Sequence, residues 1–313
     1  MSFGDVDQIA TFQPADITPP DNRQLEEPRT VSVWRSSDRW RAFLDNRPAA
    51  VAAAVVILVA LFCFVGPLIY RTDQVHVNLL SIASSPSRSH PLGTDDVGYD
   101  VLGRIMLGGQ SSLEIGLGAA ALATIIGALW GAVAGLTGGI VDSLMMRVVD
   151  ALLSIPVVVI LLVVATLVTP SVPLLIVVIA AVSWLVPARL VRAETLRLKE
   201  QNYVYASYLM GARRRHVVLR HVLPNALGTI VVNASFQVAD AILYVAYLSF
   251  LGLGIPPPAV SWGSMLSQGV NYLFQGYWWL IWPAGLAIVI LSVSFSVLGD
   301  GLRDALDPRL LRR

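Results

Sequence analysis

Two groups of residues in this sequence of 313 amino acids have the types and spacing from which chemistry can follow. The first is the stretch YASYLMGARRRHVVLRHVLP at residues 205–224, in which three arginines follow a glycine and a Leu-Pro pair ends the run. Gly211 permits a sharp change of chain direction, and Pro224 ends a helix because proline lacks an N–H donor. We therefore expect a short helix, a hinge at Gly211 and a second short helix.

This hinged segment combines positive charge with an apolar edge. The arginines present donors to acidic groups, and Val217, Val218 and Val222 supply the edge. A basic loop that only sets the topology of a membrane protein needs neither a hinge nor an apolar edge. The combination favours a docking element for a soluble partner over that simpler alternative.

The second group is a polar stripe in an otherwise apolar segment. Its members recur at helical spacing and share one helix face: Asn233, Gln237, Asp240 and Tyr244. A carboxyl group at the centre of a membrane helix costs about 2.5–3.5 kcal/mol, so such a stripe faces protein or a water-filled cavity. A cavity lining and hydrogen bonding between helices both fit this pattern. Asp150 follows Arg147 by three residues, which predicts a local ion pair.

Catalytic and metal-binding signatures are missing from the sequence. A P-loop requires a lysine after a glycine-rich turn, but the one lysine, Lys199, follows AETLRL. His216 and His221 are five residues apart and fall on different helix faces, which does not suit a zinc pair. The single cysteine, Cys63, excludes a disulfide within the chain. We expect no catalytic site, no metal site and no cofactor bound by this chain.

The elements that position these residues are membrane helices. The sequence is 55% hydrophobic and only 14% charged, against about 25% charged in soluble domains. Several apolar runs are long enough to cross a bilayer. We therefore predict an all-α polytopic membrane protein with six transmembrane helices, at residues 49–70, 112–136, 144–168, 172–190, 226–251 and 280–299.

The distribution of Lys and Arg predicts the orientation. The segment between the fourth and fifth spans, the N-terminal flank and the C-terminal tail are all basic and lie on one side in a six-span count. We assign them to the cytoplasm. This divides the chain into a cytoplasmic tail at 1–48, a first span, an external segment at 71–111, a core at 112–301 and a cytoplasmic tail at 302–313. Residues 33–47 fit an interfacial helix or a solvated tail anchored by tryptophans.

A stripe of small residues runs along the second predicted span. Its members recur every four residues: Ala119, Ala123, Gly127, Gly131 and Gly135. Small residues allow two helix backbones to approach closely in lipid. We expect tight contact with another helix, in this chain or in a partner; a substrate path along the stripe is the alternative.

The sequence also resembles a known family, the permease subunits of binding-protein-dependent ABC importers. Their cytoplasmic E-A-A-x-x-x-G-x(9)-I-x-L-P signature is matched by Ala206, Gly211, Leu223 and Pro224. It resembles most the second, C-type, permease subunit of dipeptide and oligopeptide importers over about residues 45–311. The stretches that carry this likeness are HPLGTDDVGYDVLGRIMLGG, GGIVDSLMMRVVDALLSIP, PARLVRAETL, RHVLPN, LSFLGLGIPPPAVSWGSML and LGDGLRDALDPRL.

Five positions depart from the family pattern. Tyr205 replaces the signature glutamate, Ser207 its second alanine, and His221 the hydrophobic residue before Leu-Pro. In the fifth span, Val245 stands where the family often has a glutamate, and Asp240 where a small neutral residue is usual. The first three departures change residues that the resemblance expects at the ATPase contact. The last two bear on which substrate is expected.

The resemblance implies a type I ABC importer permease with coupling helices at about 203–222, in the bacterial cytoplasmic membrane. Its implied partners are a second permease subunit in a heterodimer, one fused or two separate ATPases that bind MgATP, and an extracytoplasmic substrate-binding protein; no nucleic acid is implied. The implied ATPase-coupling residues are Tyr205, Ala206, Ser207, Gly211, Ala212, Arg213, Arg214, Arg215, His216, Leu223 and Pro224.

Several functions remain compatible with the sequence. Under the resemblance the stripe Asn233, Gln237, Asp240 and Tyr244 would line the translocation pathway. The substrate would be a di- or oligopeptide, with nickel, glutathione or a glycoside-type solute as alternatives. A proton-coupled secondary transporter using Asp150 or Asp240 is a different class, and a purely structural membrane protein is a third.

Overall fold

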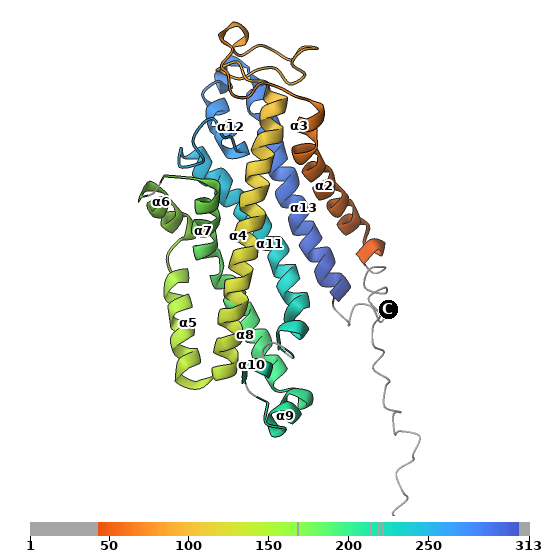
Figure 1. Ribbon diagram of the computed structural model, residues 1–313, viewed down its shortest axis with the longest axis vertical. Helices are drawn as coiled ribbons and strands as arrows, with labels where there is room; N and C mark the ends of the chain where they lie inside the picture. The colour runs from red at the N-terminus through yellow and green to blue at the C-terminus, as the bar shows by residue number, and fades with distance from the viewer. Residues whose placement is uncertain (1–42, 168, 213, 218–219, 221, 307–313) are drawn as a thin grey trace, which may run out of the picture.

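The computed structural model describes residues 43–167, 169–212, 214–217, 220 and 222–306. These residues form an elongated helical bundle (Figure 1). The helices are α2 Arg47–Phe64, α3 Gly66–Ile69, α4 Val101–Thr137, α5 Gly139–Leu153, α6 Val157–Leu167, α7 Val172–Ser183, α8 Leu185–Lys199, α9 Asn202–Leu209, α10 Arg214–Val217, α11 Leu223–Phe250, α12 Trp262–Val270 and α13 Trp282–Leu306. No strand occurs within the described ranges, so the all-α fold class is confirmed. The N-terminal tail up to residue 42, most of the predicted interfacial helix and the last seven residues lie outside them.

Two of the predicted spans are broken rather than continuous. Four unbroken segments are long and apolar enough to cross a membrane, and the number rises to six if each of two bent pairs is one span. Helices α5 and α6 meet at 80°, and α7 and α8 meet at 47°. Pro156 stands between α5 and α6 and Pro187 lies in the first turn of α8. Both lack the N–H that would continue a helix.

Helix α4 is the centre of the bundle. It begins at Val101, not at residue 112 as predicted, and its 37 residues make it about 55 Å long. It contacts α8, α11, α7 and α2. A β-carbon at Gly127 would lie 2.6 Å from Cβ of Pro187, and one at Gly135 would lie 2.8 Å from Cβ of Thr195. A β-carbon at Gly131 would collide with the carbonyl oxygen of Ala188. The glycines therefore lie where the α4 and α8 backbones approach most closely.

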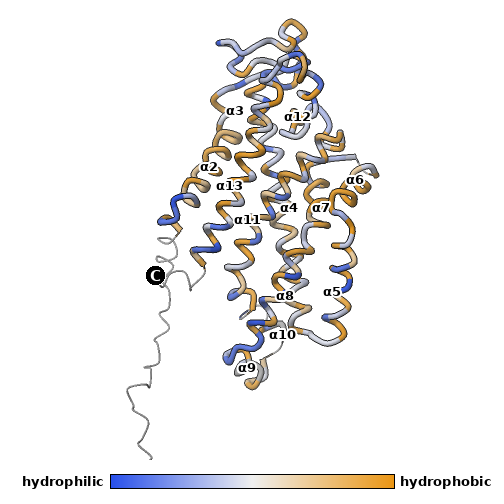
Figure 2. Tube along the Cα trace, turned by 180° about the vertical axis from the view of Figure 1, so that it is seen from behind, coloured by the Kyte–Doolittle hydropathy of each residue, from blue (hydrophilic) through white to orange (hydrophobic). Residues whose placement is uncertain are grey.

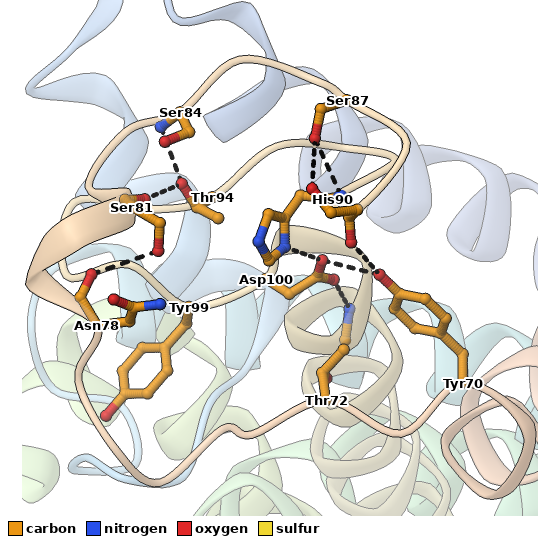
Figure 3. A network of polar contacts seen from close by, with 12 residues as sticks. Tyr70, Thr72, Asn78, Ser81, Ser84, Ser87, His90, Thr94, Tyr99 and Asp100 are labelled. Carbon is orange, nitrogen blue, oxygen red and sulfur yellow. Dashed lines mark hydrogen bonds and ion pairs between the residues drawn. The ribbon is translucent and has the colours of Figure 1, made fainter.

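A polar network organises the segment between α3 and α4 (Figure 3). Asp100 caps α4 by accepting from the N–H of Gly103 at 2.9 Å. Its other carboxylate oxygen accepts from the Tyr70 hydroxyl at 2.9 Å and lies 2.9 Å from Nδ1 of His90. The network holds this segment over the beginning of α4.

Further contacts tie this segment to the chain beyond α11. The indole N–H of Trp279 donates to the carbonyl of Thr94 at 3.2 Å, and the Tyr272 hydroxyl donates to Asp96 at 3.3 Å. Trp279 is consequently buried, whereas Trp278 and Trp282 are exposed. This end of the bundle is thus one folded cap made of residues 70–100 and 251–281 (Figure 1).

The lateral surface of the bundle is apolar. Hydrophobic residues dominate α2, α6 and α7, and hydrophilic residues gather around α8 and α9 (Figure 2). Large apolar side chains of α2 and α13, such as Leu58 and Val289, are more than half exposed. Such a surface suits contact with lipid tails, as expected of a polytopic membrane protein.

Candidate functional site

The hinged segment forms a compact helix pair at the end of the bundle opposite α12 (Figure 1). Helix α9 ends at Leu209, and Gly211 just beyond it adopts a left-handed backbone conformation with φ +83°. The N–H of Ala212 donates to the carbonyl of Ser207 at 3.0 Å, which is the six-to-one hydrogen bond of a Schellman motif. A β-carbon at Gly211 would meet nothing within 4 Å. Glycine is therefore required here by the backbone angle and not by crowding.

The helix pair is fixed to the bundle by its own apolar residues. Val204 on α9, Val217 on α10 and Val222 are fully buried, and they cluster with Leu136 of α4 and Leu198 of α8. The expected apolar edge for a partner is thus wrong for Val217 and Val222, which are used inside the chain; Val218 lies outside the described residues. These buried valines join the helix pair to α4 and α8 in one apolar cluster.

The outer surface of the helix pair is apolar at its tip. Leu209 is 78% exposed and Met210 is 81% exposed, directly before Gly211. These two residues belong to neither group of candidate residues in the sequence, although their place next to the hinge was a usable signal. They are the described apolar side chains of this element that face outward most fully.

The other predicted coupling residues are distributed over three helices. Tyr205, Ala206 and Ser207 lie on α9, and the Ser207 side chain is buried with its hydroxyl donating to the carbonyl of Tyr203 at 3.0 Å. Arg214, Arg215 and the exposed His216 lie on α10, while Arg213 lies outside the described residues. Leu223 and Pro224 form the first turn of α11. Pro224 therefore begins a helix instead of ending one, because a proline in the first turn forfeits no helical hydrogen bond.

The polar stripe on α11 lies in a cavity of about 80 Å³. The cavity forms where both bent pairs break, so that Leu153 and Val157 line it from α5 and α6 and Ser183 lines it from the end of α7. All four predicted residues contribute to the lining: Asn233, Gln237, Asp240 and Tyr244. The structure thus brings together the side chains that their helical spacing placed on one face.

One member of the stripe completes the hydrogen bonding of a broken helix. The carbonyl of Ser183 would normally accept from the N–H four residues later, but that residue is Pro187, which has none. The side-chain amide of Gln237 donates to this carbonyl at 2.6 Å. Hydrogen bonding between helices, one of the two expectations for the stripe, therefore describes Gln237.

Three further polar groups of the cavity have no hydrogen-bond partner among the described residues. Oδ1 of Asn233 and the Ser183 hydroxyl are buried without a hydrogen-bond partner. Asp240 has no hydrogen bond or ion pair with any described residue and is exposed at the cavity. Ser183 was not predicted; the proline four residues after it was the available signal.

A second, larger hollow of about 580 Å³ lies farther along α6 and α11. It is lined by the ends of both helices and by α12, with Thr166, Ser249, Ser267 and Gln268 as polar contributors. The hollow lies on the side of the cap. It could not be predicted from the sequence because its lining comes from three separate segments.

Two ion pairs join α5 to α8 next to the helix pair. The guanidinium of Arg192 donates to both carboxylate oxygens of Asp142, each at 2.6 Å. Asp150 pairs with Arg189, so the predicted pair of Asp150 with Arg147 is wrong. The geometry favours Arg189 because α8 packs against α5.

Comparison with known proteins assigns this architecture to a family. Residues 127–312, more than half of the chain, match the family described as binding-protein-dependent transport system inner membrane component. The chain belongs to this family. Residues 32–86 of the permease also match the N-terminal TM domain of oligopeptide transport permease C.

Named relatives extend over nearly the whole permease. It is 38% identical to the oligopeptide transport system permease protein OppC of Bacillus subtilis, over 96% of this chain and 97% of the relative. It is 40% identical to OppC of Escherichia coli K12, over 89% and 92% of the two chains. The dipeptide transport system permease protein DppC of B. subtilis is 35% identical over 93% and 91%. The helix pair and the cavity of the permease both fall inside the region of the family match.

Proposed function

We propose that this chain is a pore-forming subunit of an ATP-driven importer of di- or oligopeptides. The observation that carries the proposal is the hinged helix pair, which presents an exposed tip and is packed through Val204 and Val217 onto the long helices. The relatives named for oligopeptide and dipeptide transport support peptides over nickel, glutathione or glycosides as the substrate.

The proposed mechanism is the transmission of force from a separate ATPase. The tip at Leu209 and Met210 would sit in a groove of the ATPase, whose closure on MgATP would push α9. The push would reach α4 and α8 through the buried valines and α5 through the Asp142–Arg192 pair. A rigid connection of this kind is what alternating access requires, because packed interfaces switch between discrete arrangements.

The other components of the proposed importer follow from the ATPase being a separate protein. ATP chemistry belongs to one fused or two separate ATPase partners, and this chain carries no nucleotide site of its own. A second permease subunit would complete the pathway, and an extracytoplasmic binding protein would deliver the peptide to the cap. The helix pair and both termini lie on the cytoplasmic side, as the excess of Lys and Arg there supports.

The proposed path of the peptide runs along α11. The hollow of about 580 Å³ receives it below the cap, and the cavity with Asn233, Gln237, Asp240 and Tyr244 lies farther along the same helix. The proposed domain division is a cytoplasmic tail at 1–48, a first span at 49–70, an external segment at 71–111, a permease core at 112–301 and a cytoplasmic tail at 302–313.

The hinge provides the experiment that tests this function. Gly211→Val forces a β-branched residue to φ +83°, a strain of about 1–3 kcal/mol. In vesicles that contain the complete importer, we expect peptide uptake per ATP hydrolysed to fall about fivefold or more, with assembly retained. Normal coupling in this variant contradicts the proposal.

A matched control separates the hinge from glycine loss in general. Gly139 also has positive φ, +58°, and a β-carbon there would meet nothing within 4 Å. It is the first residue of α5, outside the helix pair. We expect Gly139→Val to carry the same kind of backbone strain and to leave the ratio of uptake to ATP hydrolysis unchanged.

The unpaired Asp240 favours one alternative, a proton-coupled secondary transporter. A carboxyl group without a partner in a membrane span is typical of proton carriers. Uptake that survives ATP depletion and stops with a protonophore would support this alternative. Uptake that stops with ATP depletion and survives the protonophore would support the importer.

A further inference from the structure

The cavity on α11 has an excess of hydrogen-bond acceptors. The Asp240 carboxylate accepts only, and Oδ1 of Asn233 is a buried acceptor without a partner. The side-chain amide of Gln237 donates one hydrogen bond to the Ser183 carbonyl. No lysine, arginine or histidine lines the cavity among the described residues. A positively charged group that donates hydrogen bonds therefore suits this site.

The neighbouring arginines do not supply that charge. Arg189 pairs with Asp150, and Arg192 pairs with Asp142 through two hydrogen bonds. Both pairs hold α5 against α8 and neither arginine lines the cavity. A carboxylate placed in a membrane span without a partner is costly, and a cationic ligand removes that cost.

The size of the cavity limits the ligand to a small group. A volume of about 80 Å³ holds several water-sized groups, since one water needs about 10–15 Å³ on the same measure. It is too small for a whole peptide. An ammonium group with its first waters fits, and the rest of the ligand would lie outside the cavity.

We propose that this cavity binds a protonated amine through the Asp240 carboxylate and the Asn233 amide oxygen. The hydroxyls of Ser183 and Tyr244 line the same space and complete a shell of oxygens. That the amine arrives as part of a peptide rests on the proposed function. That the cavity prefers an amine rests only on the oxygens that line it. On a peptide the amine is either the amino terminus or a lysine side chain.

Uptake measurements distinguish these two sources. Vesicles with the complete importer and excess binding protein receive trialanine, N-acetyl-trialanine or the acetylated tripeptide with a central lysine. We expect Asp240→Asn to lower the uptake rate about tenfold for peptides that enter by a free amine, because a hydrogen bond to a charged group is lost, and to leave N-acetyl-trialanine unchanged. A loss confined to trialanine identifies the amino terminus, and a loss confined to the lysine peptide identifies the side chain.

The matched control is another exposed carboxyl group on a membrane helix. Glu114 lies on α4 and does not line the cavity. We expect Glu114→Gln to transport all three peptides at the unaltered rate. Because every variant meets the same binding protein, the preferences of that protein cancel in the ratio of variant to unaltered chain. An equal loss for all peptides in Asp240→Asn, or no loss, would overturn the proposal.

A direct measurement tests the site even if the chain does not transport peptides. Thermal unfolding of the purified permease assembly is followed with ethylammonium or with tetramethylammonium, which has the same charge but no N–H donor. We expect ethylammonium to raise the unfolding temperature of the unaltered chain and of Glu114→Gln, but not of Asp240→Asn, and tetramethylammonium to raise none. Equal effects of both ions, or dissociation of the subunits by Asp240→Asn alone, would show that Asp240 does not bind an amine.

Discussion

Replacing Gln237 with leucine removes the amide that donates to the Ser183 carbonyl at 2.6 Å. Pro187 cannot supply the missing N–H, so the carbonyl is left without a donor inside the bundle. An unsatisfied buried acceptor costs about 1–3 kcal/mol, while side-chain hydrogen bonds within membranes average about 0.6 kcal/mol. We therefore expect Gln237→Leu to lower the free energy of unfolding by about 1 kcal/mol.

A second substitution tests the reason for this cost. Pro187→Ala restores a backbone N–H four residues after Ser183 and keeps the β-carbon that lies against Gly127. In that background the carbonyl can accept within the helix, as in an unbroken α-helix. The cost of Gln237→Leu should then fall close to zero. The two substitutions together form a double-mutant cycle.

The assay is reversible unfolding of the purified chain in mixed micelles, followed by circular dichroism. Gln237→Glu serves as a control of similar size, because its carboxylate cannot donate and should reproduce the loss in the proline background. An equal cost of Gln237→Leu with proline and with alanine at 187 would refute the reasoning, since Gln237 would then stabilise the fold in some other way.

Two further substitutions test the contacts of α8 in the same unfolding assay. Asp142→Asn removes the negative charge and one of the two oxygens that accept from Arg192, and should cost about 1–3 kcal/mol. Glu194→Gln, whose partner Arg197 is 65% exposed, should cost less than about 1 kcal/mol; equal costs would show that the α5–α8 pair stabilises the fold no more than an exposed pair does. Gly131→Ala places a β-carbon against the Ala188 carbonyl and should destabilise by about 1–3 kcal/mol. Gly285→Ala, where the nearest atom would be 3.8 Å away, should be neutral or stabilising by up to about 1 kcal/mol, and a similar outcome at both glycines would contradict the close approach of α4 and α8.

Local patterns in the sequence determined the class of fold. They also identified the residues of the hinged helix pair and of the polar stripe on α11. Apolar runs predicted an all-α membrane protein because bilayer thickness sets the length of a span. The three-four spacing of Asn233, Gln237 and Asp240 placed them on one face, and the structure puts them in one cavity. Gly211 adopts the left-handed backbone that made glycine a hinge candidate. Each of these inferences depends on residues close together in the chain.

The tertiary structure alone decided which partners these residues meet. Asp150 pairs with Arg189, 39 residues away, instead of Arg147 on the same helix, because α8 lies beside α5. The sequence predicted that Val217 contacts another protein, whereas in the structure it is buried in a cluster with Leu136 and Leu198. The position of Pro187 indicates that the Ser183 carbonyl lacks its helical donor. The side chain that donates to this carbonyl, Gln237, lies 54 residues away in the sequence. Helical periodicity reports which side of a helix a residue occupies, whereas the neighbour on that side is set by how helices distant in sequence come together.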